Sequence, residues 1–293
     1  MNLILTVGEV VAPVFILALV GFAWVRAGFA YQIEFVTRMA MTLSIPCLIF
    51  VALMQTEIPP AALTTLSVAT VATYALVTVA MVGLAGVFGL EMRTYLAPLI
   101  FGNTGNLGLP LALFAFGDEG LGYAVVVFAI MAIYSFTIGI WMVSGGGSPL
   151  KALREPLVWG TLLGALFLWQ GWQTPTWITN TVELIGQMAI PLMLITLGVA
   201  VARLSPKGLL APLALGGVKV VICVALAWAV GLWFDMPPVA FAVLVLQVAT
   251  PVAVTSYLLA EKYGADADAV AGLVVASTTL SVVSLPLILA FVI

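Results

Sequence analysis

The chain has 293 residues, of which 64% are hydrophobic and 7% charged, with a formal net charge of −3 and no histidine. A soluble fold of this size cannot hide so much apolar surface, because a folded protein needs a polar exterior. The nine Lys and Arg residues are scattered, which excludes a nucleic-acid binder, and the long apolar runs exclude an outer-membrane barrel.

A bilayer crossing requires about 20 mostly apolar residues, and the sequence contains ten such segments. We expect an all-α membrane protein with helices at about 4–25, 34–53, 61–89, 94–116, 121–143, 156–171, 180–202, 209–234, 238–260 and 267–292. The first segment lacks a basic stretch and a small-residue cleavage site, so we expect a membrane helix there and not a cleavable signal.

The basic residues predict the orientation of these segments. Connections with and without Lys and Arg alternate along the chain, and the latter carry Glu57, Asp118, Glu119 and Asp235. Positive residues mark the cytoplasmic side, so we expect a multi-pass protein of the cell (inner) membrane with both termini outside. The residues near the cytoplasmic ends are Arg26, Arg38, Arg93, Lys151, Arg154, Arg203, Lys207 and Lys262. Tryptophans at both ends of the segments indicate an aromatic belt.

The two halves of the chain share a proline pattern. Three matches recur in order at nearly one shift: Pro13 and Gly21 with Pro156 and Gly164, Ile45-Pro46 with Ile190-Pro191, and Pro110 with Pro251. We therefore expect two five-helix repeats, 1–143 and 156–293, joined by a cytoplasmic linker at 144–155 that contains Gly145-Gly146-Gly147-Ser148-Pro149. Because five is odd, the second repeat is inverted, which is typical of secondary transporters.

Two segments are interrupted by residues that do not continue a helix. They read Phe101-Gly102-Asn103-Thr104-Gly105-Asn106-Leu107-Gly108-Leu109-Pro110 and Gln247-Val248-Ala249-Thr250-Pro251. Proline removes a backbone donor, and freed backbone groups inside a bilayer must be satisfied by protein or by a water-filled cavity. With Thr250 as N-cap and Pro251 as first helical residue, two half-helix N-termini would meet at the bilayer middle and favour a carboxylate. For either segment alone, a proline kink is the alternative.

The interruptions also indicate the candidate binding residues. We expect Asn103 and Asn106 to donate side-chain amide hydrogens to the substrate or to carbonyls of 238–260, and Pro110 and Pro251 to fix where the helices restart. Lys219 either snorkels to the cytoplasmic surface or faces the cavity as counter-charge to an anion or a helix C-terminus. The other polar candidates are Gln247, Thr250, Tyr134 and Ser135, with Ser277, Thr278 and Thr279 in the last segment.

Three motifs in the sequence are typical of one transporter family. They read Asn103-Thr104-Gly105-Asn106-Leu107-Gly108-Leu109-Pro110-Leu111, Pro251-Val252-Ala253-Val254-Thr255-Ser256-Tyr257-Leu258-Leu259-Ala260-Glu261-Lys262-Tyr263-Gly264 and Ser44-Ile45-Pro46-Cys47-Leu48-Ile49-Phe50. They resemble the signatures of the auxin efflux carrier family, and the likeness covers essentially the whole chain. The chain departs from that family after Lys219, where a proline that often follows the basic residue is missing.

The resemblance implies a fold like that of bile-acid sodium symporters, with ten transmembrane helices in two inverted five-helix repeats and broken helices 4 and 9 crossing at the bilayer middle. It also implies a scaffold domain from helices 1, 2, 6 and 7 and a transport domain from helices 3–5 and 8–10. Members are usually homodimers through the scaffold. Bacterial members are linked to carboxylates such as malonate or malate, and plant members export auxin.

We therefore expect a secondary transporter that moves small organic anions by alternating access at the crossing. The alternatives are a sodium-coupled symporter of bile-acid type substrates, and a channel or receptor on the same fold. Sodium coupling through Gln247, Thr250 or unwound carbonyls, proton coupling and uniport all stay open. Because the chain lacks histidine and a Gly-x-Ser-x-Gly motif, we expect no enzyme. No metal or other cofactor is expected, and the partners are the anion, membrane lipid and a second copy of the chain.

Overall fold

The structure, a computed structural model, describes residues 3–144, 156–203 and 210–293. Its regular elements in these ranges are helices, and extended pairing there is limited to an isolated antiparallel bridge between Gly102 and Val252. The linker that the sequence predicts at 144–155 lies outside the described residues from position 145 onward. The same holds for the basic residues Lys151, Arg154 and Lys207.

The helices follow the apolar segments of the sequence, apart from the two interruptions and α6, which runs through the connection predicted between 116 and 121. The N-terminal half contains α1 (Leu3–Arg26), α2 (Ile33–Met39), η1 (Ala40–Ser44), α3 (Ile45–Gln55), α4 (Pro60–Phe88), α5 (Met92–Ile100), η2 (Thr104–Gly108), α6 (Leu109–Tyr134), η3 (Ser135–Gly139) and α7 (Ile140–Ser144). The C-terminal half contains α8 (Pro156–Gln170), α9 (Thr176–Gln187), α10 (Ala189–Arg203), α11 (Leu210–Trp233), α12 (Pro238–Val248), α13 (Val254–Tyr263) and α14 (Ala267–Val292). The η elements are single π-helical segments, and α6 bends at Gly117, which has φ 63° and ψ −152°.

Seven helical segments of the described residues are long and apolar enough to cross a bilayer, and two shorter apolar helices accompany them. Large apolar side chains are exposed on their outer faces, as at Val79 on α4 and Phe291 on α14. Lipid solvates such side chains, whereas water does not. The prediction of an all-helical, multi-pass membrane protein is confirmed.

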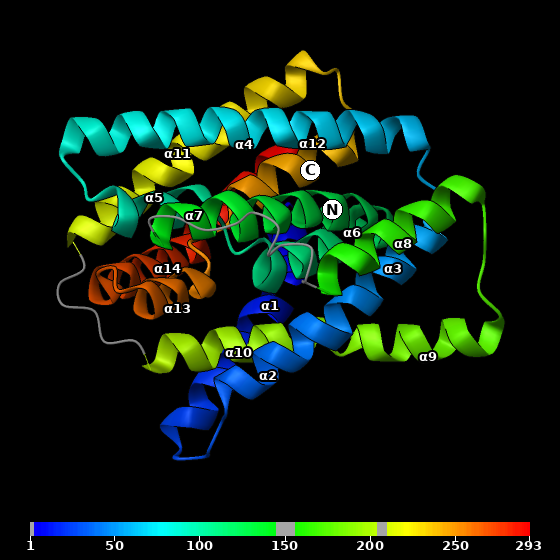
Figure 1. Ribbon diagram of the computed structural model, residues 1–293, viewed down its shortest axis with the longest axis horizontal. Coiled ribbons are helices and arrows are strands. Elements are labelled where there is room, and N and C mark those ends of the chain that lie inside the picture. The colour runs from blue at the N-terminus through cyan, green and yellow to red at the C-terminus, as the bar shows by residue number, and fades with distance from the viewer. Residues whose placement is uncertain (1–2, 145–155, 204–209) are drawn as a thin grey trace.

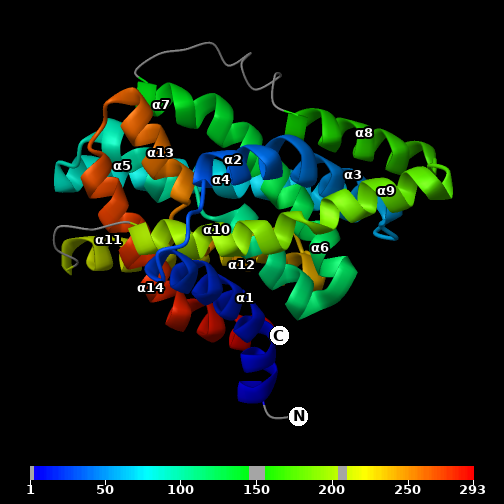
Figure 2. The ribbon, with the colours of Figure 1, turned by 90° about the horizontal axis from the view of Figure 1, so that it is seen from below.

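Several connections between helices lie at one of the two ends of the molecule's long axis. Figure 1 shows the connection 171–175 at one end of this axis and the start of α5 with the end of α10 at the other. Arg93 lies in the first turn of α5, and Arg203 is the last residue of α10. These two basic residues therefore share one end of the molecule. The start of α1 and the end of α14 lie near each other in two perpendicular views (Figures 1 and 2).

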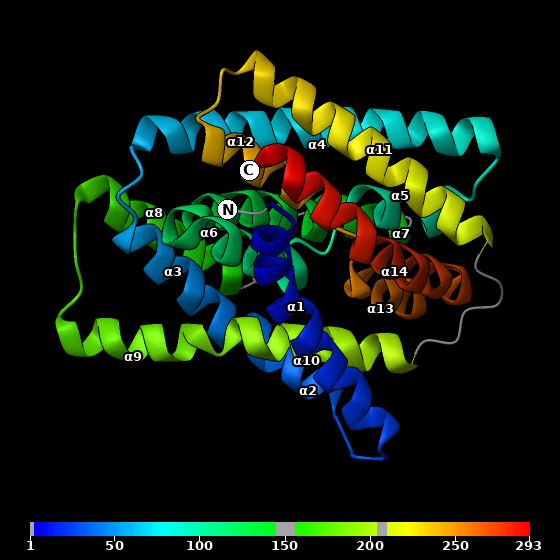
Figure 3. The ribbon, with the colours of Figure 1, turned by 180° about the vertical axis from the view of Figure 1, so that it is seen from behind.

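Close helix pairs join the two halves of the chain. α1 crosses and packs against α10 (Figure 3), and α3 packs against α8. A Cβ at Gly21 would overlap the backbone of Ile195, and one at Gly198 would overlap that of Ala18. On the other pair, Gly160 lies against the backbone of Pro46. Small residues let helix backbones approach in a membrane, where packing and not removal from water drives association.

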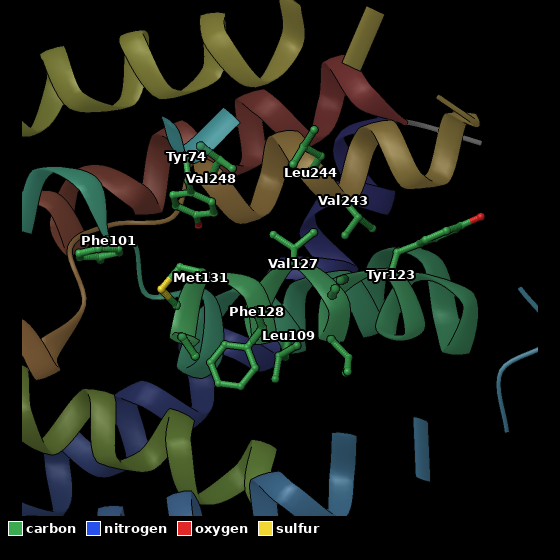
Figure 4. Packing of buried hydrophobic residues seen from close by; sticks show 14 of the residues in the cluster. Tyr74, Phe101, Leu109, Tyr123, Val127, Phe128, Met131, Val243, Leu244 and Val248 are labelled. Carbon is green, nitrogen blue, oxygen red and sulfur yellow. The ribbon is translucent and has the colours of Figure 1, made fainter. Parts of the chain in front are cut away.

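Buried apolar side chains fill the space between α6 and α12. Figure 4 shows Val127 of α6 facing Val243 of α12, with Leu244 and Val248 on the same helix. Phe101, the first residue of the first interruption, belongs to the same cluster. The first interruption and α12, which ends at the second, therefore pack against the same core.

Most tryptophans lie on the outer surface, as an aromatic belt requires. The exposed ones are Trp24, Trp141, Trp159, Trp169, Trp172, Trp177 and Trp233. Trp228 instead packs edge-on against Phe241, with ring centroids 4.9 Å apart, so its role is packing within the protein.

Candidate functional site

The two interrupted segments meet in an extended bridge. Residues 101–103 separate α5 from η2, and residues 249–253 separate α12 from α13; we call these two stretches together the bridge. Gly102 pairs with Val252 in antiparallel orientation. A Cβ at Gly102 would overlap the hydroxyl of Thr250, so only glycine permits this approach.

Asn103 holds the bridge through its main chain. Its N–H donates to the carbonyl oxygen of Pro251 at 2.7 Å, and its own carbonyl accepts from the N–H groups of Leu107 and Gly108 at 3.1 and 3.2 Å. The Asn103 side chain is 4% exposed, and its Nδ2 has no hydrogen-bond partner. The buried hydroxyl of Thr104 has no partner either.

The expected contact between Asn103 and a carbonyl of the second interruption therefore exists, but the main chain makes it and the side-chain amide does not. An unpartnered buried donor costs about 1–3 kcal/mol, so two neighbouring ones call for an explanation. Thr104 was not among the site residues that the sequence predicted. Its position directly after Asn103, at the interruption, is the signal that indicates it.

Asn106 and Pro110 follow the bridge in the first half. Asn106 is half-buried in η2, and Pro110 is the second residue of α6. The α-helix begins at Leu109, after the π-helical η2, so Pro110 lies at this restart, and its role in fixing the restart stays a prediction. The missing N–H of Pro110 withholds a hydrogen bond from the carbonyl of Asn106, four residues earlier. Pro251 lies in the bridge itself. The two prolines therefore do not occupy corresponding positions.

Thr250 ends one helix and does not begin the next. α13 begins at Val254, its N-cap position is Ala253, and no side chain caps it. The Thr250 hydroxyl instead donates at 2.6 Å to the carbonyl oxygen of Gln247 at the end of α12, which also accepts from the N–H of Thr250 at 3.3 Å. The prediction of Thr250 as N-cap and Pro251 as first helical residue is therefore wrong.

Gln247 packs between α12 and the first half of the chain. Its side chain is fully buried, and its Nε2 donates to the carbonyl oxygen of Ala124 in α6 at 3.4 Å. Its Oε1 has no partner, and a Cβ at Gly108 would overlap this oxygen. Gln247 therefore lies at the contact between α12 and η2, beside the bridge.

Lys219 reaches the bridge from α11. Its side chain is fully buried, and its Nζ donates to the main-chain oxygen of Thr250 at 2.9 Å. The alternative in which Lys219 snorkels to the cytoplasmic surface is wrong, because the ammonium is held at the carboxyl end of α12. This is the helix C-terminus role that the sequence left open.

The last helix also contacts the bridge. The Ser277 hydroxyl in α14 accepts a hydrogen bond from the N–H of Val252 at 3.0 Å and donates to the carbonyl oxygen of Val274. Thr278 is half-buried and its buried hydroxyl has no partner, whereas Thr279 is exposed and bonds within its own helix. Of these three candidates, Ser277 satisfies the bridge directly.

Tyr134 lies beside the bridge and does not bond to it. Its hydroxyl pairs with that of Thr78 on α4 at 2.9 Å, and its ring packs edge-on against Phe101, with centroids 5.4 Å apart. Ser135 follows as the first residue of η3 and is half-buried. Tyr134 thus supports the first interruption through Phe101.

A cavity of about 330 Å³ lies between α3 and α8 on one side and α4 and α6 on the other. Its lining is mainly apolar and includes the side chains of Thr64, Ser67 and Thr161. None of the site residues predicted from the sequence lines it. Within the described residues, no group of three or more His, Cys, Asp and Glu side chains could hold a metal ion.

Comparisons with known proteins extend over the whole chain. A family model described as a membrane transport protein matches residues 6–150 and 143–289. An uncharacterized transporter of Methanothermobacter thermautotrophicus is 28% identical over 297 residues, covering 95% of this chain and 96% of its own. An uncharacterized transporter of Methanocaldococcus jannaschii is 28% identical over 203 residues, 64% of each chain.

Proposed function

We propose that this chain, which belongs to the family of membrane transport proteins, is a secondary transporter of small organic anions, with carboxylates such as malonate or malate as its substrates. The observation that carries the proposal is the bridge. Two interrupted helices meet there, with unpartnered donors on Asn103 and Thr104 and the ammonium of Lys219 close by. Interrupted helices at the junction of two repeats are where secondary transporters bind substrate.

The charge and hydrogen-bonding groups at the bridge favour an anion. The first turn of η2 presents backbone N–H groups at a helix N-terminus, which carries positive dipole charge. The Asn103 amide and the Thr104 hydroxyl add donors that the protein itself leaves unpaired. Within the described residues, Lys219 takes part in no ion pair. A carboxylate would accept from these donors and offset the buried positive charge.

We further propose ten membrane crossings in two inverted repeats. The contact of α1 with α10 has a counterpart in the contact of α8 with α3. Gly21 and Gly164, which match in the sequence, both lie where a Cβ would press on the opposite helix, against Ile195 and Phe50. The nearness of the start of α1 and the end of α14 agrees with an even number of crossings (Figure 2).

Alternating access would move one group of helices against the other. We place α1, α2, α3, α8, α9 and α10 in a scaffold and the remaining helices in a transport domain that carries the bridge. The cavity of about 330 Å³ lies between α3 and α8 of the first group and α4 and α6 of the second, which is where a path to the bridge would open. We also propose the cell membrane as the location, with both termini outside.

Uptake by proteoliposomes tests this function. Purified protein is reconstituted, and radiolabelled malonate is offered at increasing concentration, with protein-free liposomes as control. The proposal expects saturable uptake that unlabelled malate reduces by competition. Uptake equal to that of protein-free liposomes for a panel of mono- and dicarboxylates would contradict it, and a non-saturating ion current would favour a channel.

A further inference from the structure

We propose that the ammonium of Lys219 occupies the place of a coupling cation at the carboxyl end of α12, so that this transporter works without bound sodium. The inference rests on the proposed function for its transport consequence. Its structural part, a tethered positive charge in a cation position, rests on the bridge alone.

Lys219 lies too deep to reach either membrane surface. It is nine residues beyond Leu210, the first residue of α11, which is about 14 Å at 1.5 Å per residue. The hydrocarbon core is about 30 Å thick, so this position is near its middle. The side chain is fully buried, and its Nζ is directed at the main-chain oxygen of Thr250, 2.9 Å away.

Lys219 contacts the carbonyl oxygen of Thr250, which lies between α12 and α13 and outside both helices. Three neighbouring main-chain groups have partners: the carbonyl of Gln247 accepts from the Thr250 hydroxyl, the carbonyl of Pro251 accepts from the N–H of Asn103, and the N–H of Val252 donates to Ser277. The oxygen of Thr250 receives the ammonium. At this depth such a group must be satisfied by protein or by a water-filled cavity, and here Lys219 satisfies it.

A cation is what this position attracts. The end of α12 carries the negative pole of the helix dipole, and unwound carbonyls with half-helix C-termini are the groups that coordinate Na⁺ in secondary transporters. Here the cation is the ammonium of a side chain, which is covalently attached to α11. Among the described residues Lys219 forms no ion pair, and no carboxylate cluster could hold a metal ion.

A buried ammonium without a carboxylate is costly, so its presence needs a compensating role. We assign to the ammonium the role of stabilising the carboxyl end of α12 and the adjoining bridge. Loss of the charge should therefore impair the bridge, even when a hydrogen bond to Thr250 is kept. Sodium should neither stabilise the protein nor drive transport.

The first test uses the wild-type protein in detergent and needs no substrate. Its midpoint of thermal unfolding is measured in NaCl, KCl and choline chloride at equal ionic strength. The proposal expects the same midpoint in all three salts, because a ligand raises stability only where it binds. A rise that is specific to sodium would overturn it.

The second test measures initial rates of malonate uptake in proteoliposomes. Wild-type rates should be equal in sodium and choline media. Lys219→Met should lose at least about tenfold in rate, which corresponds to loss of one strong interaction. Lys262→Met, which removes an exposed lysine of α13, should keep the wild-type rate.

A third variant separates charge from hydrogen bonding and covers the case in which Lys219→Met does not fold. Lys219→Gln retains a donor for Thr250 without the charge, and we expect it to fold and to be as impaired as Lys219→Met. Wild-type uptake by either variant, or sodium-dependent uptake by the wild type, contradicts the proposal. If the wild type takes up no malonate in any salt, the proposed function fails, and the unfolding comparison still decides the role of Lys219.

Discussion

The main-chain N–H of Asn103 donates a hydrogen bond of 2.7 Å to the carbonyl oxygen of Pro251. These residues are far apart in the sequence, and each lies where a helix is interrupted. The bond therefore joins the two halves of the chain at the point where both lack helical hydrogen bonds. It leaves the side-chain amide of Asn103 available, and that amide is the centre of the proposed site.

The close approach at Gly102 predicts a steric effect of a single methyl group. In Gly102→Ala the new Cβ would overlap the hydroxyl and the carbonyl of Thr250. We expect a loss of about 1–3 kcal/mol of stability, the usual cost of overpacking, seen as a lower midpoint of thermal unfolding. Gly83→Ala is the control, because a Cβ at Gly83 meets nothing within 4 Å. Equal midpoints for both variants would contradict the close approach.

The contact of α14 with the bridge predicts a structural role for Ser277. Ser277→Ala leaves the buried N–H of Val252 without its acceptor, which should lower stability by about 1–3 kcal/mol. Thr279→Ala removes a hydroxyl that is exposed and bonds within α14, so its unfolding midpoint should stay near that of the wild type. A Ser277→Ala protein as stable as Thr279→Ala would show that another group satisfies Val252.

Glycines at the contact of α1 with α10 and at the contact of α3 with α8 predict similar losses of stability when they are replaced by alanine. Gly198→Ala presses on the backbone of Ala18, and Gly160→Ala presses on that of Pro46. Both variants should unfold at lower temperature than Gly8→Ala, since a Cβ at Gly8 meets nothing within 4 Å. If only one of the two is destabilised, the proposed equivalence of the pairs loses its support.

The charge pattern predicts the side on which each end of the molecule lies. The free thiols of Cys47 and Cys223 are first replaced by serine or alanine. A cysteine introduced at Glu261, which is exposed near the end of α13, should react with a membrane-impermeant maleimide only after the cytoplasmic side is opened. One introduced at Asp235 should react in intact cells. The reverse labelling pattern would overturn the orientation.

The helices were predictable from the sequence because the apolar runs are long and their ends carry charged residues, Gly or Pro. The interruptions were predictable as well, since Gly102, Asn103 and Pro251 do not continue a helix. The residue at which the second helix restarts was not predictable. Threonine is a residue type favoured at N-caps, but the hydroxyl of Thr250 donates to the carbonyl of Gln247 instead. That competition depends on where α12 ends.

Contacts between distant segments could not be predicted from the sequence, because they depend on how the helices pack. The depth of Lys219 in its helix predicted a buried or snorkelling side chain equally well. Its partner, Thr250, belongs to a different helix, and the packing of α11 against α12 brings the two together. The pairing of Gly102 with Val252 depends in the same way on how the two halves dock.

The most direct test of the account compares Asn103→Ala with the wild type in two assays. Because Nδ2 of Asn103 is buried without a partner in the protein, its removal relieves an unsatisfied donor, and the midpoint of thermal unfolding should not fall below that of the wild type. Removal of a donor to the substrate should lower malonate uptake about tenfold or more, at about 1.4 kcal/mol per factor of ten. Equal uptake by the two proteins at equal incorporation would contradict a substrate site at the bridge.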